Sequence, residues 1–92
     1  MSMKFVLSVH VYNGELEKRG VATRDKRYHI LKLVDLARQA EGETDEEELE
    51  KINKNIQYHE KEIEELTERL RIIAATINYF EAGSFTPAQE EP

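Results

Sequence analysis

Residues 49–80 carry a seven-residue repeat of apolar side chains, the feature that most restricts how this chain can fold. Nine of the ten repeat positions are apolar, and the tenth is His59. Neither Gly nor Pro interrupts the chain between Gly42 and Gly83. A repeat sustained over five heptads is typical of a coiled coil. Its positions, alternately a and d, are Leu49, Ile52, Ile56, His59, Ile63, Leu66, Leu70, Ile73, Ile77 and Phe80.

Helix start and stop signals predict two helices. Thr44 suits an N-cap position and is followed three residues later by a glutamate, as in a capping box, so a long helix is predicted over 45–82. Thr23 suits the N-cap of a first helix over 24–40. Because the link between them is short, the two helices should form an antiparallel helical hairpin.

Residues 4–22 predict a strand or a β-hairpin. The segment KFVLSVHVY alternates its side chains with the period of a strand, and Asn13-Gly14 after it suits a two-residue hairpin turn. The predicted fold class is therefore α+β, mostly α, in one small domain over 1–83. Residues 84–92 show no periodicity, which predicts a disordered C-terminal tail.

The predicted first helix is too short to cover the second, which indicates a partner subunit. It should reach only to about residue 61 of the long helix, whereas residues 70–80 are apolar on nearly all sides. A chain of 92 residues is also near the size at which a single core barely stabilises a fold. We therefore expect a homodimer or higher homo-oligomer with antiparallel packing. The candidate interface consists of Phe5, Leu7, Val9, Ile56, His59, Ile63, Leu66, Leu70, Ile73, Ile77 and Phe80.

His59 is the one polar residue in the repeat. A polar residue in an apolar seam penalises slipped registers, and this is the interpretation that we favour. A pH switch is an alternative, because imidazole titrates near neutrality. A metal site is disfavoured, since the sequence HEKE lacks the second histidine of the zinc-protease motif and Glu62 offers only one further ligand. The sequence therefore predicts neither a metal nor a cofactor.

Charge is divided unevenly along the chain, whose net charge is -6. Residues 1–40 carry eight Lys and Arg against four Asp and Glu, whereas residues 41–92 carry five against fifteen. A basic cluster beside the predicted start of the first helix could hold a nucleotide or other anionic small molecule, because helix starts present free amide groups. Alternatively, these cations balance the acidic long helix. The candidate anion-site residues are Arg19, Arg24, Lys26, Arg27, Tyr28 and His29.

Residues 65–83, ELTERLRIIAATINYFEAG, resemble the dimerisation helix that ends MerR-type regulators. In that family a leucine-spaced helix closes on an aromatic pair and an acid, matched here by Tyr79, Phe80 and Glu81. The resemblance implies a helix that pairs with a second copy. It implies no DNA-binding role, because those regulators carry a winged-helix domain before this helix, and a predicted strand and helix stand in its place here.

Composition excludes several kinds of chemistry. Without cysteine, the chain forms neither disulfides nor thiolate metal sites. No stretch approaches the ~20 apolar residues of a membrane span. We therefore expect no membrane partner and a cytoplasmic location. Duplex DNA is not an expected partner, because the chain as a whole is acidic.

The function that these patterns favour is that of a non-enzymatic, homo-oligomeric interaction protein. It would bind another protein through its helical seam and strand edge, as an adaptor, chaperone or inhibitor of the kind that a phage or mobile element encodes. An enzyme is disfavoured, because no Ser, His and Asp arrangement has local support. The alternative is an oligomer that captures a nucleotide or other anion at the basic cluster.

Overall fold

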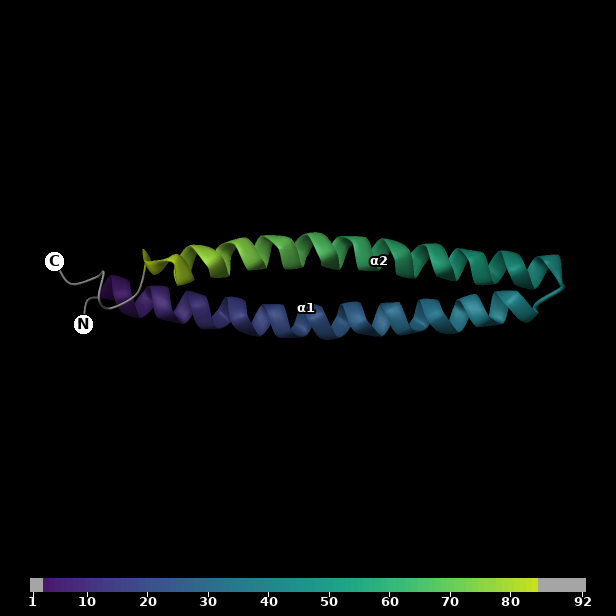
Figure 1. Cartoon of the computed structure of the whole chain (residues 1–92), viewed down its shortest axis with the longest axis horizontal. Coiled ribbons are helices and arrows are strands. Elements are labelled where there is room, and N and C mark those ends of the chain that lie inside the picture. Colours follow the sequence, from purple (N-terminus) through teal and green to yellow (C-terminus); the bar gives the residue numbers. More distant parts are fainter. Residues whose placement is uncertain (1–2, 85–92) are drawn as a thin grey trace.

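Two long helices form an antiparallel hairpin (Figure 1). The computed structural model describes the backbone of residues 3–84 and the side chains of residues 9–82. Helix α1 spans Met3–Gly42, helix α2 spans Glu46–Tyr79, and a π-helical turn, η1, spans Phe80–Ser84. The molecule is a rod 70 Å long and 14 Å across, with a radius of gyration of 20.3 Å, whereas a compact chain of this length would have about 12 Å. The predicted helical hairpin is confirmed.

Carboxylates organise the turn between the helices. A carboxylate oxygen of Glu43 accepts hydrogen bonds from the amides of Thr44 and Asp45, at 3.1 and 3.0 Å. Asp45 is the N-cap of α2, and its carboxylate accepts a hydrogen bond from the Glu47 amide at 3.0 Å. The predicted cap Thr44 is therefore wrong, because the residue after it has the extended backbone of an N-cap and its carboxylate accepts the hydrogen bond of that amide. The predicted stop at Gly42 is confirmed.

The core is a single seam between the two helices. From α2, the heptad positions Ile52, Leu66, Ile73 and Ile77 are buried, as the repeat predicts. From α1, the buried residues are Ala22 and Leu36. These two are fourteen residues apart with His29 midway, so α1 also presents a heptad repeat to its partner helix.

The predicted strand or β-hairpin over residues 4–22 is wrong, and so is the α+β fold class. Residues 3–42 form one uninterrupted helix, and no strand occurs within residues 3–84. Gly14 does not have the positive φ that the predicted turn requires. As a helix, this segment satisfies its own backbone hydrogen bonds and reaches η1: the Tyr12 hydroxyl donates to Glu81 at 2.9 Å, and its ring lies 6.1 Å from that of Phe80. A lone β-hairpin would have left an unpaired edge.

The predicted start of the first helix at residue 24 is also wrong. The Thr23 hydroxyl donates to the Arg19 carbonyl at 2.7 Å, the bond that a threonine makes inside a helix, so it caps nothing. Because α1 runs the length of α2, the chain itself covers residues 62–80 of the long helix. A second subunit is therefore not needed for that purpose. The predicted tail falls, apart from Ser84 in η1, on residues 85–92, outside the described part.

No helix within the described residues is both long and apolar enough to cross a membrane.

Candidate interaction surface

Most of the predicted oligomer interface lies inside the hairpin. Leu66, Ile73 and Ile77 are buried against α1 of the same chain. The remaining predicted residues after the turn are partly buried in the same seam: Ile56, His59, Ile63 and Leu70 of α2, and Phe80 of η1. Val9 of α1 is also partly buried. Phe5 and Leu7 lie where only the backbone is described. These α2 side chains therefore hold the hairpin together, and the surface for a partner must be sought elsewhere.

His59 meets a second histidine across the seam. Its Nδ1 lies 2.7 Å from Nδ1 of His29, and the two ring centroids are 5.0 Å apart. Tyr28 packs edge-on against both imidazoles, at 5.1 Å from His29 and 6.4 Å from His59. Tyr58 does the same from α2, at 6.1 and 4.9 Å. Four aromatic rings, two from each helix, thus gather around the seam, nearer to the interhelical turn than to the other end of the rod.

The pKa of His59 is lowered from its ordinary value of 6.5. The largest cause is the loss of hydration in the seam, and the neighbouring His29 and Lys32 act in the same direction. The Glu62 carboxylate acts in the opposite direction, by favouring the imidazolium. The environment therefore favours the neutral ring at this position.

The predicted anion-site residues do not converge on one site. They lie in the middle of α1, where the backbone amides are already bonded within the helix, so the helix start on which the site depends does not exist. Lys26 and His29 point toward the seam and are partly buried, whereas the other members of the cluster are exposed: Arg19, Arg24, Arg27 and Tyr28. Consecutive residues of a helix face different directions. The cluster is therefore spread around α1.

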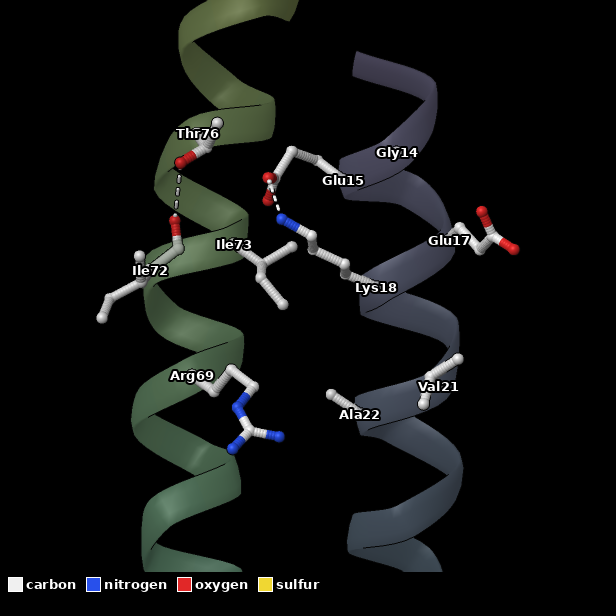
Figure 2. Close-up of a pocket in the computed structure, with 10 residues that line it drawn as sticks. All are labelled: Gly14, Glu15, Glu17, Lys18, Val21, Ala22, Arg69, Ile72, Ile73 and Thr76. Carbon is white, nitrogen blue, oxygen red and sulfur yellow. Dashed lines mark hydrogen bonds and ion pairs between the residues drawn. The ribbon is translucent and has the colours of Figure 1, made fainter. Parts of the chain in front are cut away.

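An open groove of about 680 Å³ runs along one side of the hairpin (Figure 2). Ala22 and Ile73 point into the space between the helices, and Val21 and Ile72 lie farther out on either side. The groove exists because α1 contributes small residues here, Ala22 and Gly14, opposite isoleucines of α2. A second groove, of about 300 Å³, is lined by residues that include Tyr28, Lys32, Asn55 and His59.

Both grooves open on the same face of the rod. Val21 lines the first and Tyr28 the second, and residues seven apart lie above one another in a coiled coil. Multiples of seven residues also separate Tyr58 and Tyr79 from Ile72, so these three side chains of α2 lie on one side of that helix. In α1, Val11 is seven residues from Lys18, which lines the first groove, so Val11 lies on the groove side as well. All these apolar side chains are exposed. We call this side the groove face, with the apolar residues Val11, Val21, Tyr28, Tyr58, Ile72 and Tyr79.

A smaller apolar stripe lies away from the grooves, on α1 alone. Ile30, Leu31 and Val34 are exposed there, although each is a large hydrophobic residue. None of the three lines a described groove. We call this group the outer stripe. The groove face is not predicted by the sequence patterns above, and the signal that could have found it is the heptad spacing of Val21 with Tyr28 and of Ile72 with Tyr79.

Opposite charges separate onto the two helices. Helix α1 carries eight basic against five acidic side chains, a net charge of +3, and α2 carries five against nine, a net charge of -4. Between described residues, each ion pair joins two residues of the same helix, as Lys51 and Glu48 do at 3.3 Å. The predicted balance between the basic cluster and the acidic helix is therefore not made by ion pairs across the described hairpin.

Within the described residues, no group of three or more His, Cys, Asp and Glu side chains could hold a metal ion. Comparison with known proteins gives no match to a family model, to a curated protein or to a solved structure. The resemblance of residues 65–83 to the MerR-type dimerisation helix thus gains no support from the family comparison. The groove face, the outer stripe and the histidine pair are the features from which a function must be argued.

Proposed function

We propose that this chain is a non-enzymatic interaction protein that acts as a homodimer, in which the groove faces of two hairpins pack together as an antiparallel four-helix bundle. The observation that supports this most strongly is the concentration of exposed apolar side chains on the groove face, six of them from both helices. Large apolar patches on one side of a molecule are typical of interfaces. A hairpin with only one seam gains a second layer of packing by dimerisation.

The size of the groove face suits a second copy. It extends along a rod 70 Å long and 14 Å across, which is enough for the roughly 800 Å² per partner that a standard interface buries. Two hairpins are rods of equal length, so their faces match along the whole interface. Aromatic residues such as Tyr28 and Tyr58 are also the type that contributes most at interfaces.

The charges of the helices favour one of the two possible symmetric arrangements. If the two-fold axis runs parallel to the rod, α1 of one copy lies against α2 of the other, so that net charges of +3 and -4 face each other. If the axis crosses the rod, like charges face each other. The parallel axis also keeps side chains at equal heights opposite one another. Tyr28 and Tyr58 lie at one height, because both contact the same two histidines.

The outer stripe stays exposed in this dimer and is the surface that we assign to another protein. A pair of such stripes on opposite sides of a four-helix bundle would suit an adaptor, a chaperone or an inhibitor. A cytoplasmic location is part of the same proposal.

Sedimentation equilibrium of two matched double variants tests the dimer. Val21→Glu/Ile72→Glu places two charges on the groove face, where the native side chains are 45 and 53% exposed. Leu31→Glu/Val34→Glu places them on the outer stripe, at 60 and 43% exposure. An unpaired charge in an interface costs about 3 kcal/mol or more, so the groove-face variant should associate at least ~100-fold more weakly. The outer-stripe variant should remain a dimer of twice 10.8 kDa.

Circular dichroism accompanies the measurement, because both variants should keep the helix content of the native chain. A wild-type chain that sediments as a folded monomer at 100-micromolar concentration (~10⁻⁴ M, a weak limit for a specific complex) would contradict the proposal. So would an outer-stripe variant that is monomeric while the groove-face variant is dimeric.

A further inference from the structure

The histidine pair couples the two helices through a hydrogen bond that depends on protonation. A bond between Nδ1 of His29 and Nδ1 of His59, at 2.7 Å, needs a proton on one nitrogen and a lone pair on the other. The pair can accept one additional proton and keep this bond, because a charged ring can donate to a neutral one. A second additional proton removes the lone pair and places two positive rings 5.0 Å apart.

The surroundings do little to compensate for two charges at this place. From α1, the charged and titratable groups near the pair are Lys32 and Asp35, with Tyr28 against the rings. From α2, they are Glu62 and Tyr58. Lys32 adds like charge, and the carboxylate of Glu62 offsets it. Among the described residues, Glu62 is the carboxylate that raises the pKa of His59, and Lys32 opposes it, whereas Asp35 lines the second groove without such an effect on His59.

We propose that the His29–His59 pair is a pH-sensitive switch that weakens the contact between α1 and α2 in mild acid. Below about pH 6.5 both imidazoles are protonated in the unfolded chain, whereas the folded hairpin keeps one of them neutral. The unfolded chain then binds one proton more than the hairpin, so stability falls as the pH falls. The stabilising contribution is complete above pH 6.5, and it is lost as the pH drops toward the lowered pKa of His59. This proposal concerns the hairpin itself and does not depend on the proposed dimer.

Urea unfolding followed by circular dichroism at pH 8.0, 7.0, 6.5, 6.0 and 5.5 tests the switch, at constant ionic strength and protein concentration. EDTA is included so that no metal ion bridges the imidazoles. For the wild-type chain, the unfolding equilibrium constant should rise below pH 6.5 by up to about tenfold per pH unit. The double variant His29→Gln/His59→Gln should lose most of this dependence, since amides do not titrate.

His10→Gln is the matched control, because His10 is exposed and is the third histidine of the chain. This variant should keep the wild-type pH dependence. Equal pH dependence in the wild-type chain and the double variant would overturn the proposal.

A histidine titration followed by NMR keeps the proposal testable even if the double variant does not fold. In the wild-type chain, one imidazole of the pair should titrate well below the other, as coupled groups do. Titration of His29 and His59 in a single step would overturn the switch.

Discussion

Side chains of one chemical type contribute very differently to the stability of this molecule, according to the side of the helix on which they lie. Ile73 is 4% exposed in the seam, whereas Ile30 is 43% exposed on the outer stripe. Burial of an apolar side chain stabilises a fold in proportion to the area removed from water. In a hairpin with a single seam, few residues are buried, so each of them carries a large share of the stability. The histidine pair occupies two of these scarce seam positions, which is why its protonation has a consequence for the whole hairpin.

Ile73→Ala should destabilise the hairpin by roughly 2 to 5 kcal/mol, because it removes buried methyl and methylene groups and leaves a cavity. Ile30→Ala makes the same chemical change on the outer stripe, and its effect should be within about 0.5 kcal/mol. Urea unfolding of the two variants measures the difference. Equal losses would mean that these residues do not lie on the inner and outer sides of the hairpin.

Of the two helices, α1 has the lower intrinsic helix stability. Its interior contains Gly14 and Gly20, and glycine in a helix interior costs roughly 0.5 to 1 kcal/mol relative to alanine. Its seam contains charged residues, Glu15 and Lys26, which are partly buried. Helix α2 has its own cap, an acidic first turn and an apolar repeat. We infer that α1 owes its helical state to packing along α2, since tertiary contacts supply most helix stability in proteins.

The stability of the variant Gly14→Ala distinguishes a helix at residue 14 from the predicted hairpin turn. A Cβ added at residue 14 meets no atom within 4 Å, so in the helix alanine should stabilise the chain by roughly 0.5 to 1 kcal/mol. In a turn that needs positive φ at this residue, the same change would be destabilising. Thermal unfolding distinguishes the two. Gly20→Ala is the control for helix propensity alone, since its added Cβ also meets no atom within 4 Å and it lines no described groove.

At the scale of the whole molecule, the rod is 70 Å long and only 14 Å across, so most of its side chains lie at the surface. Its grooves are open, and its exposed apolar side chains lie on two separate sides: the groove face and the outer stripe. Such a shape suits binding between proteins better than the enclosure of a small molecule, because ligand sites usually bury most of their ligand. Because α1 and α2 carry net charges of opposite sign, the charges also favour one orientation of a bound partner over the other.

The proposed two-fold axis parallel to the rod places both interhelical turns at the same end of the dimer. Thr44→Cys introduces a single labelling site in the exposed turn, because the chain has no other cysteine. Spin labels at this residue should lie roughly 20 to 25 Å apart, about two helix diameters, by double electron–electron resonance. An axis across the rod would separate them by nearly the rod length of 70 Å. Labelled Val21→Glu/Ile72→Glu protein should give no defined distance.

Local sequence patterns are enough to predict α2 and the short turn that precedes it. Its repeat from Leu49 to Phe80 is long, regular and free of breakers, so local preference and burial pattern agree, and the hairpin could be predicted from Gly42 onward. For residues 4–22 local preference and burial pattern disagree: alternation and Asn13-Gly14 favour a β-hairpin, and only contact with α2 and η1 makes a helix the better state. The pairing of His29 with His59 and the alignment of Val21 with Ile72 join residues 30 and 51 positions apart. These contacts depend on the register between two helices, which neither helix encodes alone, so they could not be predicted before the two helices were placed side by side.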